Sequence, residues 1–292
     1  GIGVTALGQS STATALMTAS FVGQGLISLP AALAVMRGAD IGTALMAVLF
    51  SFDLSWLSPM FIFVGVVLFI TRQAQTAGRV GRICIGLGLM LLALERIVQA
   101  SDPILASPVT PVVLDAMGND LLAEILIGAV LAIVSYSSLA VVLLVAAMAA
   151  SQVVPVQMAL GLVLGANLGN GLAAVLTMAG SATEVRQVMV GNLTFKVLGV
   201  ALMAPFVGLW LRYVQPHMPG VAHGVVLFHL AYNLIISVGF IGLTQWVARW
   251  VARFLPRKPQ EQGYHPRYLD PSALSTPSLA MASVRAMMKK AS

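Results

Sequence analysis

The 292-residue sequence is poor in charged residues. Asp, Glu, Lys and Arg make up 9% of it, whereas 59% is hydrophobic and the mean hydropathy is +0.93. Soluble globular proteins carry roughly 25% charged residues, so this composition predicts a membrane protein with several spans. The net charge of +6 does not indicate nucleic-acid binding. Its basic residues stand mainly in short loops and at the C-terminal end, where such residues orient membrane segments.

Further absences restrict the classes of protein to which the chain can belong. The single cysteine, Cys84, excludes an internal disulfide and is expected to be a small core residue. The sequence has no Gly-rich phosphate loop followed by Lys and Ser/Thr, so nucleotide hydrolysis is not expected to drive it. The stretch GQSST lacks the second glycine of a nucleophile elbow, and no Ser–His arrangement is evident. We therefore predict that the chain is not an enzyme and needs no cofactor.

Apolar stretches fill most of the first 250 residues. A helix needs about 20 apolar residues to cross the hydrocarbon of a bilayer. By this measure, candidate membrane segments are 1–21, 29–50, 56–71, 82–99, 121–150, 156–179, 188–212 and 223–247. The sequence opens without Met or a basic leader and stops inside a helix-forming run, so both ends are interpreted as cuts in a longer protein.

Polar residues and glycines recur at an offset of 127 positions. The matched pairs are Ser10/Ser137, Ser11/Ser138, Gly38/Gly165, Ala39/Ala166, Asp40/Asn167 and Gly42/Gly169. Coincidences of this kind are hard to obtain by chance in a lipid-like composition, so we predict an internal repeat. In each repeat a Ser pair stands about 27 residues ahead of a glycine motif. Paired glycines around an Asx residue suit a helix that breaks, or one that another backbone approaches closely.

Loop charges predict the topology. The loop 71–82 carries three arginines and should be cytoplasmic, as should the basic cluster after residue 248. If segment 121–150 crossed the membrane once, that cluster would lie outside. If the segment instead dips in and returns on the same side, with its tip at 136–138, every later loop agrees with the positive-inside rule. The same count of crossings toward the N-terminus makes 1–21 part of a hairpin that enters from the opposite side. We therefore predict an all-α polytopic membrane protein with two inverted-topology repeats, each with a re-entrant helical hairpin and a broken transmembrane helix.

The predicted domains follow from this topology. Residues 1–99 form the first repeat, whose hairpin lacks its entering arm, and 121–255 form the second. Residues 100–120 are an extracytoplasmic connector, and the polar, Pro-containing stretch 256–292 is a cytoplasmic linker leading toward an absent helical domain.

Buried hydroxyls, amides and charges are the candidate site. At a hairpin tip in mid-membrane, such groups can replace water around a small ion or an oxyanion, which favours a binding role for the two Ser pairs, Asn167 and Asn170. Asp40 is costly inside a membrane and either binds a cation or is neutralised by Arg37, three residues earlier. Lys196 either attracts an anion or holds the fold.

The two motifs resemble a known family. QSSTA (9–13) with GADIGT (38–43), and YSSLA (136–140) with GANLGN (165–170), are similar to the doubled motif of the sodium-dependent phosphate cotransporters, the type II Na/Pi proteins and their bacterial relatives. The likeness covers roughly residues 1–250. In the second motif Tyr136 stands at the family's Gln position, Leu139 at a usual Ser and Asn170 at the Thr.

The resemblance implies a site at both hairpins. Together with the residue pattern it predicts substrate or ion contacts at Gln9, Ser10, Ser11, Thr12, Asp40, Thr43, Tyr136, Ser137, Ser138, Asn167 and Asn170. Sodium is expected at Gln9, Ser10, Ser11, Ser137 and Ser138. The tail resembles the segment that leads into a PhoU-like cytoplasmic domain in bacterial members.

These features predict sodium-coupled symport of inorganic phosphate by alternating access, in a bacterial inner membrane with a cytoplasmic C-terminus. Phosphate, sodium and the lipid bilayer are the expected partners, nucleic acid is not, and a homodimer and a PhoU-like domain are expected associations. Three alternatives stay open. They are a transporter of another anion or one coupled to protons, a phosphate sensor or regulator that does not transport, and, more distantly, an intramembrane hydrolase.

Overall fold

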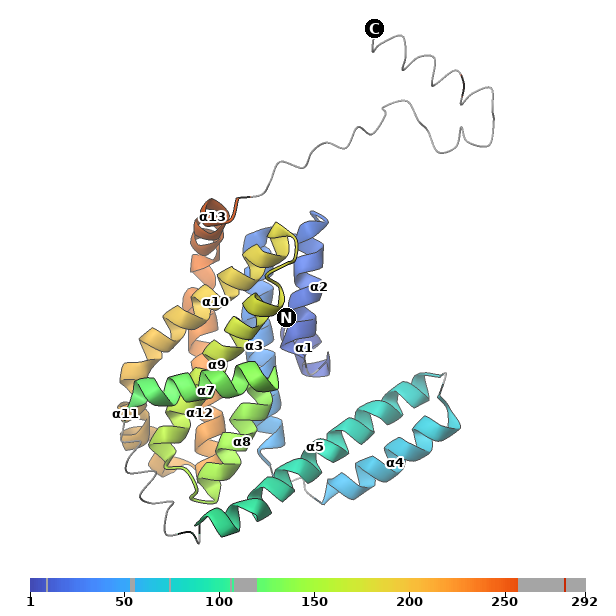
Figure 1. Ribbon diagram of the computed structural model, residues 1–292, viewed down its shortest axis with the longest axis vertical. Coiled ribbons are helices and arrows are strands. Elements are labelled where there is room, and N and C mark those ends of the chain that lie inside the picture. Colours follow the sequence, from blue (N-terminus) through green and yellow to red (C-terminus); the bar gives the residue numbers. More distant parts are fainter. Residues whose placement is uncertain are drawn as a thin grey trace. The chain divides into compact units, whose positions relative to one another are not determined.

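Within the part of the chain that the computed structural model describes, every regular element is a helix (Figure 1). The described residues are 1–8, 10–52, 56–73, 75–105, 107, 120–256 and 281. Five helical stretches among them are long and apolar enough to cross a membrane: Leu29–Phe50, Thr76–Ala93, Val156–Thr177, Thr183–His217 and Val221–Phe254. The composition therefore predicted the class correctly. Most of the expected connector and linker lies outside the described residues.

The chain divides into one unit of residues Gly1–Leu255 and a second of residues Pro256–Ser292. All the helices named below belong to the first unit. Its C-terminal helices are α10 (Thr183–Met203), η1 (Ala204–Phe206), α11 (Val207–Leu209), η2 (Trp210–Val214), η3 (Gln215–His217), α12 (Val221–Phe240), η4 (Ile241–Leu243) and α13 (Thr244–Phe254).

Two long helices, α3 (Leu29–Phe50) and α9 (Val156–Thr177), begin at sequence signals for a helix start. The Ala31 N–H donates to Oγ of Ser28 at 3.4 Å, and a proline follows in the first turn of α3. Pro155 precedes α9 directly. A proline is tolerated here because the first N–H groups of a helix have no partner inside it. The predicted segment 29–50 is confirmed at both ends.

The helices α4 (Leu57–Thr71) and α5 (Thr76–Leu105) pack against each other (Figure 1). A Cβ atom on Gly65 would lie 2.7 Å from the carbonyl oxygen of Gly81, so the absence of side chains there lets the two backbones meet. The helix α5 extends beyond the predicted segment 82–99 in both directions.

In each of two pairs of short helices, a break of two residues separates the two helices. The first pair is α1 (Ile2–Gly8) with α2 (Ser11–Gly23), and the second is α7 (Leu121–Ser135) with α8 (Ser138–Ala150). Each helix of the second pair is about 20 Å long at 1.5 Å per residue, less than the hydrocarbon thickness of roughly 30 Å. Neither helix of that pair could therefore cross a bilayer alone.

Residues 2–8 form α1, a short arm ahead of the first break, and the expectation that the first hairpin lacks its entering arm stays a prediction. The hydroxyls of Thr5 and Thr14 lie 2.8 Å apart and join α1 to α2, and both side chains are buried. The arm also packs on α3, where a Cβ atom on Gly42 would lie 2.7 Å from the Ile2 carbonyl oxygen.

The helix bounds repeat along the chain. The helices α2 and α8 start and end 127 positions apart, and so do α3 and α9. Close approaches repeat as well. A Cβ on Gly38 would meet Ile2 N at 3.1 Å, and one on Gly165 would meet Ala129 N at 2.8 Å. The offset seen in the sequence is thus an offset between structural elements; whether the repeats are inverted across a membrane stays a prediction.

The prediction of a broken transmembrane helix at each glycine motif is wrong. Both α3 and α9 run without interruption through their motifs. The glycines allow close approach instead, since a Cβ on Gly169 would lie 2.2 Å from the carbonyl oxygen of Ala129 on α7. A glycine inside a helix costs only about 1 kcal/mol relative to alanine, and tight packing offsets that cost.

The helix α9 lies at the centre of the packing. It contacts α7, α8, α10 and α12, and its side chains Leu160, Val163 and Leu164 are fully buried. They belong to a core shared with Phe228 and Tyr232 of α12. This core holds α7 and α8, the short helices of the second pair, in place against α9.

Candidate functional site

The second break is built from three consecutive residues. Tyr136 ends α7 in the left-handed conformation, with φ of 52°. Ser137 is extended and caps α8, because its Oγ accepts the Ala140 N–H at 3.1 Å. Its carbonyl oxygen also accepts the hydroxyl of Ser135 at 3.2 Å. The chain therefore turns where the sequence predicted a tip.

The first break has the same construction. Ser10 is extended, and its Oγ accepts the Ala13 N–H at 3.1 Å as the cap of α2. Gln9, predicted as a phosphate and sodium contact, lies outside the described residues. A serine that caps a helix uses one acceptor site, so its O–H remains available to donate to a ligand.

The two breaks meet at one small pocket with a volume of about 50 Å³. It is lined by Ser10, Ser11, Thr12, Thr43, Tyr136, Ser137, Ser138 and Leu139. Seven of these eight residues carry a hydroxyl, and none of the eight carries a charge. Because a buried water needs roughly 15 Å³, the pocket has room for a few waters or for ions of comparable total size. Seven predicted site residues thus lie together; Asp40, Asn167 and Asn170 do not line it.

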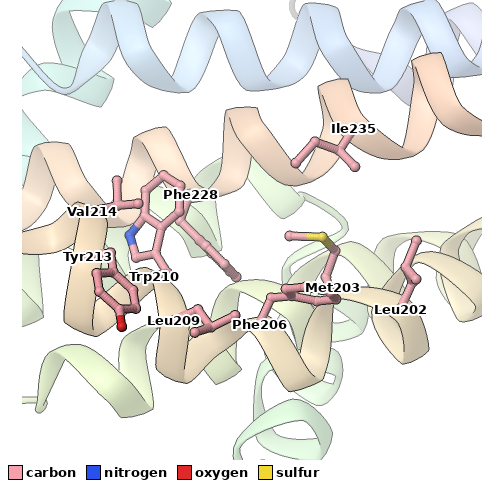
Figure 2. A pocket seen from close by; sticks show the side chains of 9 residues that line it. All are labelled: Leu202, Met203, Phe206, Leu209, Trp210, Tyr213, Val214, Phe228 and Ile235. Carbon is pink, nitrogen blue, oxygen red and sulfur yellow. The ribbon is translucent and has the colours of Figure 1, made fainter.

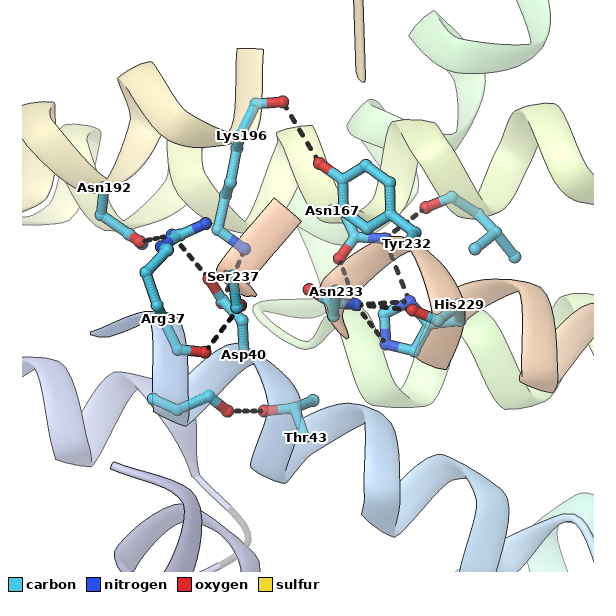
Figure 3. Close-up of polar contacts among 12 residues, drawn as sticks. Arg37, Asp40, Thr43, Asn167, Asn192, Lys196, His229, Tyr232, Asn233 and Ser237 are labelled. Atoms are coloured by element: carbon cyan, nitrogen blue, oxygen red, sulfur yellow. Dashed lines mark hydrogen bonds and ion pairs between the residues drawn. The ribbon is translucent and has the colours of Figure 1, made fainter. Parts of the chain in front are cut away.

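Asp40 lies in a cluster of buried charges (Figure 3). Its Oδ2 is 2.6 Å from the Arg37 guanidinium, and its Oδ1 accepts a hydrogen bond from Lys196 Nζ at 2.9 Å. Arg37 also donates to the Asn192 side chain, and Ser237 donates to the Arg37 carbonyl oxygen at 3.1 Å. The neutralisation of Asp40 by Arg37, one of two readings of the sequence, is therefore present, and Lys196 adds a second cation. The two cations leave Asp40 with less need of a bound sodium ion.

Asn167 lies in a second, uncharged cluster (Figure 3). Its Nδ2 is 3.0 Å from His229 Nδ1 and donates to the Val163 carbonyl oxygen at 2.9 Å. Asn233 donates to Asn167 Oδ1 at 3.3 Å and to the His229 carbonyl oxygen at 2.9 Å. These contacts join α9 to α12.

Positions 40 and 167 are equivalent in the repeat, and each connects its helix to a later one. Neither His229 nor Asn233 was among the site residues predicted from the sequence. The available signal was their spacing of four residues within an otherwise apolar segment, which places both on one face of a helix.

Replacing Asn233 by leucine should weaken the junction between α9 and α12. Asn167 Oδ1 would lose its donor while buried, which costs about 1–2 kcal/mol. We expect the melting temperature of the purified protein to fall by roughly 3–6 °C. Ile235→Leu, at an exposed position of the same helix, is the control and should leave it unchanged. Equal melting temperatures would contradict a role for this cluster in stability.

A larger cavity of about 420 Å³ lies between the end of α10 and α12 (Figure 2). Its lining is almost wholly apolar and includes Met203, Phe206, Trp210 and Phe228. A phosphate ion placed there would lose its hydration without gaining donors. The hydroxyl-lined pocket is therefore the candidate site for an anion.

An all-helical chain with two serine-capped breaks that share one pocket has the features of a membrane transporter. The chain belongs to the Na+/Pi-cotransporter family, whose model matches residues 1–99 and 105–242. The family suggested by the two motifs is thereby confirmed.

Curated relatives match nearly the whole chain. It is 45% identical over 284 residues to "Putative inorganic phosphate export protein YjbB" of Salmonella typhimurium, and equally to the protein of that name in Escherichia coli K12. These matches cover 97% of this chain and 52% of YjbB, so the chain spans about half the length of these relatives. The uncharacterized protein YqeW of Bacillus subtilis is 23% identical over 250 residues, covering 86% of this chain and 81% of YqeW. No solved structure matches the chain.

Proposed function

We propose that the chain is the membrane part of a transporter of inorganic phosphate, which binds in the pocket between the two breaks. The observation that carries this proposal is that Ser10 and Ser137, equivalent residues of the two repeats, line one small polar pocket. Family membership and the name of the YjbB relatives support phosphate as the substrate. Hydroxyl donors suit an oxyanion, since a hydroxyl whose proton is not already donated can give one hydrogen bond to it; among the lining residues, Thr43 already donates to the Ala39 carbonyl oxygen at 3.1 Å.

The two helix pairs act as re-entrant hairpins that enter from opposite sides of the membrane, so that the repeats are inverted. The short lengths of α7 and α8 support this arrangement, as does the basic loop 71–82, which the positive-inside rule assigns to the cytoplasm. The C-terminus is then cytoplasmic and the membrane is a bacterial inner membrane. A homodimer and a PhoU-like domain in the full-length protein stay predictions.

Transport proceeds by alternating access, in which one repeat moves against the other around the pocket. Sodium is the coupling ion, with contacts at Gln9, the two Ser pairs and the tip backbone. Its positive charge offsets that of phosphate in a site of low dielectric, so neither ion enters well alone. This mutual dependence constitutes the coupling.

The test is phosphate flux in proteoliposomes that contain the purified chain. With labelled phosphate outside, an inward sodium gradient should drive accumulation well above the level reached with choline in place of sodium. Liposomes without protein set the background, and sulfate in place of phosphate tests the substrate. Equal phosphate flux in sodium and choline would remove sodium coupling, and flux no higher than background would remove the transport proposal.

The name of the YjbB relatives favours a second candidate, phosphate export. A symporter is reversible, and its direction follows the combined gradients of its ions. Loading the vesicles with phosphate and imposing the sodium gradient in either direction distinguishes the two. Efflux that proceeds at the same rate whichever way sodium is graded would favour an exporter independent of sodium.

A further inference from the structure

Within the part of the chain that the structure describes, the charges of the buried Arg37–Asp40–Lys196 cluster do not balance. Arg37, Asp40 and Lys196 are exposed by only 3%, 4% and 2%. Two cations face one carboxylate, so the cluster carries a formal charge of +1. Burying an unbalanced charge is costly, and a cluster that served only to hold the fold would need one cation for its one anion. The excess charge calls for an anion that is not part of the chain.

Two atoms of the cluster, the donor Arg37 Nε and the acceptor Asp40 Oδ2, make no hydrogen bond among the described residues, although Asp40 Oδ2 forms an ion pair with the Arg37 guanidinium. One terminal nitrogen of the Arg37 guanidinium contacts both the Asn192 side chain and the Asp40 carboxylate. The guanidinium carbon lies 5.1 Å from the ring centroid of Phe195. The Nε of Arg37 is buried and has no hydrogen-bond partner among the described residues. Buried polar groups without a partner are rare in native proteins, which supports a ligand in one state of the molecule.

The cluster and the hydroxyl-lined pocket both include residues of α3. Asp40 and Thr43 are three residues apart on α3 and so share a face of the helix, and Thr43 lines the pocket (Figure 3). The pocket lining carries no charge of its own, so charges around it would add to the attraction that its hydroxyls and the N-termini of α2 and α8 exert on an anion.

We propose that Arg37 and Lys196, held by Asp40, are the fixed counter-charge of the anion that binds between the two breaks. This inference rests on the proposed function and adds to it the residues that set the anion affinity. A fixed positive charge takes over part of the role of a bound cation, so fewer sodium ions are needed for each phosphate. At an effective dielectric constant of about 20, one unit charge acting over roughly 10 Å changes a binding constant by about tenfold.

Variants that change the net charge of the cluster test the proposal, because it predicts the direction in which each one changes the phosphate affinity. Lys196→Met brings the cluster to zero and should weaken phosphate binding about tenfold, measured by isothermal titration with the chain in lipid nanodiscs. Asp40→Asn brings it to +2 and should tighten binding by a similar factor. The double variant returns to +1 and should bind within about threefold of the unmodified chain. Lys196→Arg, which keeps the charge, should also bind within this range.

The control is Arg212→Gln, which removes one positive charge at an exposed position beyond α10 and should leave binding unchanged. A purely structural cluster would make both single variants bind more weakly and melt at lower temperature, with no rescue in the double variant. That pattern would overturn the inference while leaving phosphate transport intact. If the unmodified chain binds no phosphate, the proposed function fails and the inference fails with it.

Discussion

Gly165→Ala is expected to lower the melting temperature of the protein by more than about 10 °C. The added Cβ would lie 2.1 Å from the carbonyl oxygen of Ile125 and 2.8 Å from Ala129 N, both in the backbone of α7. No rotamer change can relieve contacts with a backbone, so α7 and α9 must move apart. Overpacking costs typically 1–3 kcal/mol, and contacts this short should cost at least about 3 kcal/mol.

The matched control is Gly239→Ala on α12. A Cβ there would meet nothing within 4 Å, and alanine is favoured over glycine in a helix by about 1 kcal/mol. This variant should therefore melt at the same or a higher temperature. Thermal unfolding in the same detergent provides both values. If the two variants melted alike, the close packing of α7 on α9 would not be a source of stability.

Replacing Ser10 and Ser137 together by alanine should reduce phosphate flux at least about 100-fold. Each hydroxyl caps a helix through its oxygen and keeps its O–H for the pocket. A hydrogen bond to a charged group contributes about 1.5–3 kcal/mol, so losing two should cost 3 kcal/mol or more, or about 100-fold. Flux of labelled phosphate into proteoliposomes measures this effect.

The effect of losing a helix cap must be distinguished from the effect of losing a hydrogen bond to phosphate. Ser28→Ala removes the hydroxyl that caps α3, and that residue does not line the pocket. A lost cap costs about 1 kcal/mol, so this variant should lose a few degrees of melting temperature and keep its phosphate flux. If the Ser10/Ser137 variant transported phosphate at the rate of Ser28→Ala, the pocket would not be the phosphate site.

The class of the protein and the bounds of α3 could be predicted because they depend on local properties. Low charge and long apolar runs indicate membrane helices, and the apolar segment 29–50 predicted both ends of α3 correctly. The serine caps at both breaks are likewise local, since the bond from Ser137 to Ala140 spans three residues. The offset of 127 residues was visible for the same reason, because equivalent elements carry equivalent local signals.

The glycine motifs show where local reasoning failed. They predicted broken helices, and α3 and α9 are continuous. The sequence allowed either a break or a close approach, and only the backbone of α7 lying against Gly165 decides between them. Local propensity is worth about 1 kcal/mol at such a position, and packing outweighs it.

By itself, the sequence determined that this is an all-helical protein of apolar helices with two repeated polar motifs, because composition, capping and repetition are properties of neighbouring residues. Only the tertiary structure decided that Ser10 and Ser137 line one pocket, that Lys196 pairs with Asp40 and that Asn167 contacts His229. Asp40 and Lys196 are 156 positions apart, and each could have met other partners. Their pairing depends on how closely helices can approach, which is set by the packing of many residues at once.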